Sequence, residues 1–178
     1  AASDVYKRQE IIRDTERKTG KHAAESISNN LKKEITEKRS LNPRFYDSMG
    51  TLLVRLLEDH KKGIVEYKDF LEKVVDLAKK IKYGEKPRAQ SINTPRLKVL
   101  YDNAPVPRRH AERFPEQFAL VMDRKCAEMQ AGFQDPLSLR YREARFLIQE
   151  GLEELADEFG LDINDEAIEK IFNLAKLY

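Results

Sequence analysis

Residues 42–83 read NPRFYDSMGTLLVRLLEDHKKGIVEYKDFLEKVVDLAKKIKY, and this stretch decides the fold. Apolar residues recur in it every three or four positions, a spacing that places them on one face of an α-helix. From 43 to 62 these are Phe45, Met49, Leu52, Leu53, Leu56 and Leu57, and from 66 to 83 they are Tyr67, Phe70, Leu71, Val74, Leu77, Ala78 and Ile81. Because Gly63 stands between the two runs, the stretch predicts a hairpin of two antiparallel helices.

Proline and glycine mark helix boundaries along the rest of the chain. Proline is tolerated in the first turn of a helix, and a preceding Asn, Asp or Thr caps the free amides. Helix starts are therefore predicted at Asn42-Pro43, Thr94-Pro95 and Asp135-Pro136 and, with a poorer cap, at Phe114-Pro115. Glycine closes the last turn of many helices. Helix ends are therefore predicted near Gly63, Gly84, Gly132 and Gly160.

The remaining apolar residues predict further helices and no strand. A long helix is expected over 10–39, where Ile27, Leu31 and Ile35 form a narrow stripe. Others are expected over 116–131, over 137–159 and over 165–177. The helix over 137–159 carries Phe146, Leu147, Leu152 and Leu155, and the last helix carries Ile168, Ile171 and Phe172. The predicted fold is an all-α bundle of about six helices, with an αα-hairpin and proline-containing connectors.

The predicted organisation is one domain over 10–178. It comprises a long helix and hairpin over 10–83, a basic connector with a short helix over 84–115, and a three-helix segment over 116–178. The chain begins with Ala1 instead of Met, so we expect a fragment of a longer protein. Residues 1–9 resemble junction sequence and are expected to be a scar or disordered.

The composition is that of a cytoplasmic protein. Cys126 is the only cysteine among the 178 residues, which suits a reducing compartment and excludes an intrachain disulfide. No apolar run is long enough to span a membrane, and the N-terminus lacks the apolar core of a signal peptide. We therefore expect no membrane association.

No motif for catalysis, cofactor binding or metal binding is found. Phosphate-binding loops of the types GxxxxGK[ST] and GxGxxG are missing, and His22, His60 and His110 stand apart from one another without ligand spacing. Residues 162–173 begin like a calcium loop but lack its central glycine and final glutamate. Cys126 beside Lys125 is expected to be a buried helical cysteine instead of an activated thiolate. We expect no enzymatic activity in this chain.

Charge is unevenly distributed along the chain. Residues 79–113 contain ten Lys or Arg against three acids, whereas residues 150–178 contain nine acids against two lysines. Cations at loose spacing suit a phosphate backbone, although a solvated face is the common explanation for such a run. The candidate DNA contacts are Lys79, Lys80, Lys82, Lys86, Arg88, Arg108, Arg109 and Arg113.

A series of short motifs resembles a known family. The order is Asn42-Pro43-Arg44-Phe45-Tyr46, Leu56-Leu57-Glu58, the Gly63 turn, Leu77-Ala78-Lys79, Leu100-Tyr101-Asp102-Asn103, Phe133-Gln134-Asp135-Pro136, and a helix with Arg140, Arg142, Glu143 and Arg145. In this order they resemble the C-terminal helical domain of the R subunit of type I restriction-modification enzymes, over residues 25–178.

The resemblance implies a docking role. In that family the nuclease and helicase-like ATPase domains lie upstream, and the C-terminal helical domain helps to anchor the R subunit to the methyltransferase core. The implied parent is an ATP- and Mg²⁺-dependent DNA translocase and endonuclease, and its partners are the methyltransferase and specificity subunits. The candidate partner contacts are Tyr101, Asp102, Asn103, Phe133, Arg140 and Arg142.

Alternatives to these roles remain open at this stage. Tyr101, Asp102 and Asn103 equally suit a turn that ends a helix, and the arginines of the 137–159 helix suit intrachain ion pairs. The alternative function is a free-standing helical DNA-binding or regulatory protein that uses the basic connector. The stripe of Ile27, Leu31 and Ile35 also suggests a homodimer of the isolated chain.

Overall fold

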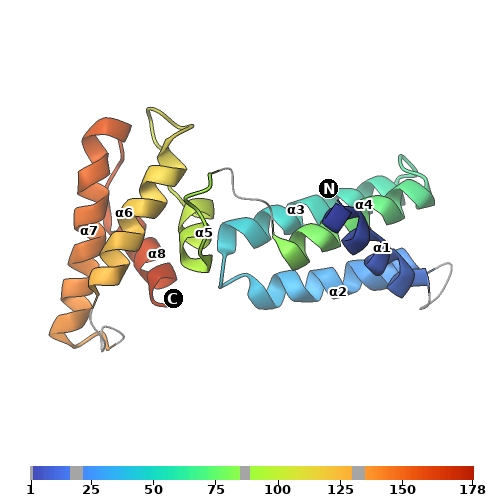
Figure 1. Ribbon diagram of the computed structural model, residues 1–178, viewed down its shortest axis with the longest axis horizontal. Coiled ribbons are helices and arrows are strands. Elements are labelled where there is room, and N and C mark those ends of the chain that lie inside the picture. Colours follow the sequence, from blue (N-terminus) through green and yellow to red (C-terminus); the bar gives the residue numbers. More distant parts are fainter. Residues whose placement is uncertain (1, 17–21, 85–88, 130–134) are drawn as a thin grey trace. The chain divides into compact units, whose positions relative to one another are not determined.

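The computed structural model describes residues 2–16, 22–84, 89–129 and 135–178 (Figure 1). Within these ranges the structure is helical and contains no strand, which confirms the all-α class. The helices are α1 (Ala2–Glu16), α2 (Ala23–Lys38), α3 (Pro43–Lys61), α4 (Tyr67–Tyr83), α5 (Pro95–Asp102), α6 (Phe114–Glu128), α7 (Leu139–Phe159) and α8 (Asp165–Ala175). No helix in the described ranges is long and apolar enough to cross a membrane.

The chain divides into two compact units, Ala1–Lys86 and Pro87–Tyr178. This differs from the single domain expected over 10–178. The reason is that the buried apolar side chains form one cluster in each unit. The segment expected as a connector over 84–115 contains a short helix, α5, and this helix and the residues after it pack into the core of the second unit.

The first unit is built on the predicted hairpin. α3 and α4 pack against each other, and α2 packs against both (Figure 1). The Asn42 side chain accepts a hydrogen bond from the Phe45 amide at 3.4 Å, with Pro43 in the first turn of α3. Gly63 turns the chain with a φ of 71°, a conformation that glycine adopts without a Cβ clash. Met49, Leu53, Phe70, Val74 and Leu77 supply much of the core.

The expected long helix over 10–39 is two helices, α1 and α2. Residues 2–9, expected to be a scar or disordered, lie within α1, which is held against α4. Asp4 lies 3.6 Å from the Lys79 ammonium, and Arg8 lies 3.4 Å from Asp76. Leu31 and Ile35 are buried against the hairpin. The stripe on α2 therefore packs within the chain, with Ile27 only partly buried.

The second unit packs α6 between α5 and α7, with α8 against α7 and α5. Its core is rich in aromatic rings: Phe114, Phe118, Phe159 and Phe172 are all buried. The predicted cap of α5 is present, because Thr94 accepts a hydrogen bond from the Leu97 amide at 3.2 Å.

The start of α7 differs from the prediction. Ser138, not Asp135, caps the helix by accepting from the Tyr141 amide at 3.1 Å. Asp135 instead accepts from the Leu137 amide at 3.0 Å and forms a turn before the helix. The predicted end of α7 is confirmed, since Gly160 adopts the left-handed conformation with a φ of 65°.

Candidate protein-interaction surface

α7 is apolar on two opposite faces. One face carries Ala144, Ile148, Leu152, Leu155 and Phe159, all buried in the core of the second unit. Phe146 lies two residues beyond Ala144, which turns it about 200° around the helix and away from that core. Its side chain is 57% exposed. Leu139 lies two turns earlier on the same outer face and is 71% exposed.

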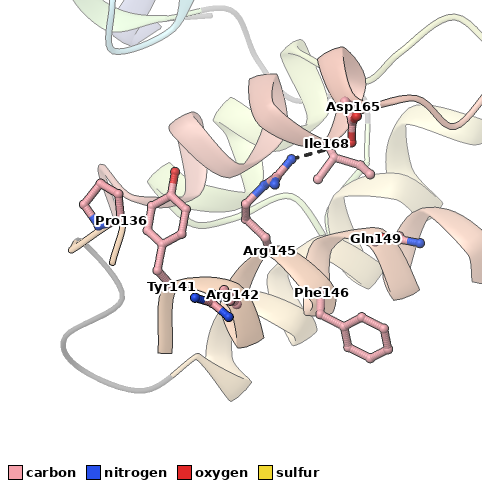
Figure 2. A pocket seen from close by; sticks show the side chains of 8 residues that line it. All are labelled: Pro136, Tyr141, Arg142, Arg145, Phe146, Gln149, Asp165 and Ile168. Carbon is pink, nitrogen blue, oxygen red and sulfur yellow. Dashed lines mark ion pairs between the residues drawn. The ribbon is translucent and has the colours of Figure 1, made fainter. Parts of the chain in front are cut away.

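A shallow groove runs beside this outer face, between α7 and α8 (Figure 2). It has a volume of about 440 Å³ and is lined by Pro136, Tyr141, Arg142, Arg145, Phe146, Gln149, Asp165 and Ile168. The Tyr141 ring packs edge-on against Phe172, with 4.9 Å between ring centroids. The core therefore fixes one wall of the groove. Figure 2 shows the Phe146 ring standing out from α7, whereas Arg145 reaches towards α8.

The two arginines of the groove differ in their surroundings. Arg145 lies 3.2 Å from Glu169 and 3.8 Å from Asp165, so its charge is balanced by α8. Arg142 is exposed, and no ion pair joins it to another residue of the described ranges. An exposed aromatic ring, an exposed leucine and an arginine thus share one helix face. Aromatic residues and Arg are the types enriched at the centres of protein interfaces.

The other candidate partner contacts divide into three groups. Tyr101 is half-buried and packs against the core, and Asn103 is buried and donates from its side chain to the Val99 carbonyl at 2.8 Å. Tyr101, Asp102 and Asn103 therefore form the end of α5, as the turn interpretation expects. Phe133 lies outside the described residues. Arg140 is exposed on α7, close to Arg142 in the sequence.

The candidate DNA contacts are divided between the two units of the chain. Lys79, Lys80 and Lys82 lie on α4 of the first unit, Lys86 and Arg88 lie outside the described residues, and Arg108, Arg109 and Arg113 belong to the second unit.

The arginines of the second unit meet the C-terminal end of α7. Arg108 lies 2.6 Å from Asp162, Arg113 lies 2.9 Å from Glu158, and Arg109 donates to the Asp157 backbone carbonyl. The backbone amides of Arg108 and Arg109 also donate to the Phe159 carbonyl, at 3.0 and 3.1 Å. These contacts place the basic connector against the acidic end of the same chain.

The surroundings of Cys126 and His60 are those of packed side chains. Burial raises the pKa of the Cys126 thiol to about 11, which leaves almost no thiolate at neutral pH. The His60 ring stacks on Phe70 with 4.2 Å between ring centroids. Within the described ranges, no three His, Cys, Asp or Glu residues are grouped in a way that could hold a metal ion.

The sequence interpretation missed Phe146 as a surface residue. It was counted with Leu152 and Leu155 as part of one helix, but its position on a helical wheel relative to Ala144 and Ile148 separates it from their face. Comparison of the chain with protein-family models, with curated proteins and with solved structures gives no match. The surface on α7 is therefore the feature from which a function has to be argued.

Proposed function

We propose that this chain is a non-catalytic docking domain that belongs to the R subunit of a type I restriction enzyme and binds the cytoplasmic methyltransferase core. The observation that carries the docking role is the outer face of α7, where Leu139, Arg142 and Phe146 lie together beside the groove. The parent family is proposed from the order of sequence motifs described above.

The outer face of α7 has the composition of an interface. Phe146 and Leu139 expose apolar area that water hydrates unfavourably, and a partner that covers it gains about 25 cal/mol per Å² before the costs of association. Arg142 supplies directional hydrogen bonds next to this apolar area. The groove gives the surface a concave edge that a partner side chain can enter.

Catalysis is assigned to the parent subunit and not to this chain. In this proposal ATP hydrolysis and Mg²⁺-dependent DNA cleavage occur in domains upstream, and the helical chain contributes attachment to the methyltransferase and specificity subunits. The alternative DNA-binding role is less favoured, because Arg108 and Arg113 face carboxylates of their own chain.

A binding measurement with the purified core tests this proposal. The immobilised chain is exposed to a methyltransferase–specificity complex encoded beside the parent gene, and binding is followed by interferometry. We expect Phe146→Ala to weaken binding about tenfold or more, as for a buried aromatic at an interface centre. The control is Val106→Ala, which removes a 77% exposed side chain in the segment leading to Arg108, near the other end of α7.

Two results would contradict the proposal. If the unmodified chain does not bind the core, the docking role is wrong. If the core binds the unmodified chain and the Phe146→Ala chain equally well, docking occurs through another surface and the assignment to α7 is wrong.

A further inference from the structure

The charges of α7 are separated along its length. Its N-terminal half contains Arg140, Arg142 and Arg145 with one acid, Glu143, and its C-terminal half contains the acids Glu150, Glu153, Glu154, Asp157 and Glu158. A helix is stabilised by the opposite arrangement, because its N-terminus carries a partial positive charge and its C-terminus a partial negative charge. Several of these charges are paired within the chain: Arg145 with α8, Glu150 and Glu154 with Lys125, and Glu158 with Arg113. On the outer face, Arg142 and Glu153 are exposed, and Glu153 accepts a hydrogen bond from the Gln149 side chain at 2.8 Å.

Residues along the outer face of α7 recur at the spacing found where one helix packs along another. Steps of three and four residues connect Leu139, Arg142, Phe146, Gln149, Glu153 and Ala156, and every one of them is exposed or half-buried. Such alternation of three and four is the spacing with which one helix faces another along a shared seam. Arg142 and Glu153 lie symmetrically about the middle of this row.

We propose that two copies of this chain associate through the outer faces of their α7 helices, packed antiparallel. An antiparallel pairing places Arg142 opposite the partner's Glu153, and the twofold symmetry repeats that ion pair at the other end. Leu139 then lies beside the partner's Ala156, and the two Phe146 rings flank the middle of the seam. Glu153 then lies near the N-terminal end of the partner's α7, where the helix dipole favours a negative charge.

The composition of the seam sets the strength of this association. Leu139 and Phe146 are its only large apolar residues, and the ion pairs form between exposed groups that salt screens. A Kd on the order of 0.1 mM is therefore expected at low salt. The proposal is independent of the parent family, because both halves of the charge complementarity belong to this chain. It uses the same face of α7 as the proposed docking, so a second copy and the methyltransferase core would compete for Leu139, Arg142 and Phe146.

Sedimentation velocity across a range of protein concentrations tests the association. At about 50 mM salt the average mass should rise from 20.7 kDa towards twice that value, and at about 500 mM salt the rise should be largely lost. Arg142→Glu and Glu153→Arg should each weaken association about tenfold or more, because each places like charges opposite one another. The double variant should restore it, while Lys170→Glu, a charge reversal on α8, should have little effect.

Three results would overturn the proposal. The first is a chain that stays monomeric at all concentrations. The second is single charge reversals that leave association unchanged, and the third is a double variant that fails to restore it. Restoration in the double variant also separates this inference from docking. Two copies that both carry the exchanged charges complement each other again, whereas an unchanged methyltransferase core gains nothing from the exchange.

Orientation is tested by crosslinking two variants in a Cys126→Ala background. Chains with Leu139→Cys are mixed with chains carrying Ala156→Cys and oxidised at low salt. Antiparallel helices bring these two positions together, so mixed disulfides should exceed those between two Leu139→Cys chains. A predominance of disulfides between Leu139→Cys chains would show parallel pairing and overturn the antiparallel arrangement.

Discussion

The Lys125 ammonium lies 3.0 Å from the Glu154 carboxylate, although the Lys125 side chain is only 10% exposed. Glu150 lies on the same side at 3.4 Å. The three residues join α6 to α7 across the core of the second unit. The hydrogen bond between Lys125 and Glu154 raises the pKa of the lysine and lowers that of the glutamate. Both shifts favour the charged forms at neutral pH.

The pair predicts a pH-dependent stability difference. Glu154→Gln should lower the free energy of unfolding by about 1 kcal/mol at pH 7. This is less than the usual contribution of a hydrogen bond to a charged group, because solvent screens the partly exposed Glu154. Because its folded pKa is lowered, the contribution of Glu154 is complete above the ordinary carboxyl pKa and is lost as the pH falls through the lowered value. Urea unfolding at pH 7 and near pH 3 measures this. A difference that persists unchanged at acidic pH would contradict the assignment, and Glu143→Gln serves as the control.

Truncation of a buried and of an exposed aromatic ring of the second unit should change folding stability by very different amounts. Phe172 is fully buried in the core that receives the inner face, so Phe172→Ala should cost about 3–5 kcal/mol of folding free energy. Phe146→Ala should change stability by less than about 0.5 kcal/mol, because Phe146 stands outside that core. Chemical unfolding of both variants at low protein concentration checks this. A large loss for Phe146→Ala would mean that its ring is buried in the folded chain.

Replacing the two glycines that have left-handed backbone conformations should destabilise the fold to different extents. Gly63 and Gly160 have φ values of 71° and 65°, so replacing either by Ala should cost about 1–2 kcal/mol for the backbone conformation. A Cβ at Gly63 meets nothing within 4 Å, whereas at Gly160 it lies 3.1 Å from the Arg108 Cβ. Gly160→Ala should therefore be the more destabilising of the two in thermal unfolding. Equal losses would show that the Arg108 segment moves away without cost.

Local signals explain what was predictable about the fold. The hairpin followed from two apolar runs, a cap at Asn42 with Pro43 directly after it, and a glycine whose turn needs a positive φ. The start of α7 was misplaced because Asp135 and Ser138 are both good caps, and the sequence does not say which of them the helix uses. The division into two cores depends on which helix faces meet in space, which spacing along the chain does not determine.

The same limit applies to the candidate site. The apolar spacing of α7 predicted the helix and named Phe146 among its apolar residues. The exposed position of Phe146 follows only from its angle on the helix relative to Ala144 and Ile148. The pairing of Arg108 with Asp162 joins residues 54 positions apart. No local pattern reveals such a contact, so the sequence left both DNA contact and a solvated face open for the basic run.

The last prediction concerns this basic cluster and DNA. Arg108, Arg109 and Arg113 already contact Asp162, the Asp157 carbonyl and Glu158, so phosphate binding would have to displace these contacts. We expect the combined replacement of the three arginines by Ala to leave duplex DNA affinity unchanged. Fluorescence anisotropy with a short duplex from about 50 to 200 mM salt measures both the affinity and its dependence on salt.

If the three arginines contact DNA phosphates, the triple variant should show a weaker dependence of DNA affinity on salt than the unmodified chain. Each phosphate neutralised on duplex DNA contributes about −0.9 to the slope of log affinity against log salt concentration, so three lost contacts would flatten it by about 2.7. The replacements also remove ion pairs between the connector and α7, so circular dichroism must first show that the variant is folded. A folded triple variant with weaker binding and a flatter slope would establish the arginines as DNA contacts and favour the nucleic-acid role. An unchanged slope would leave protein docking through α7 as the better account.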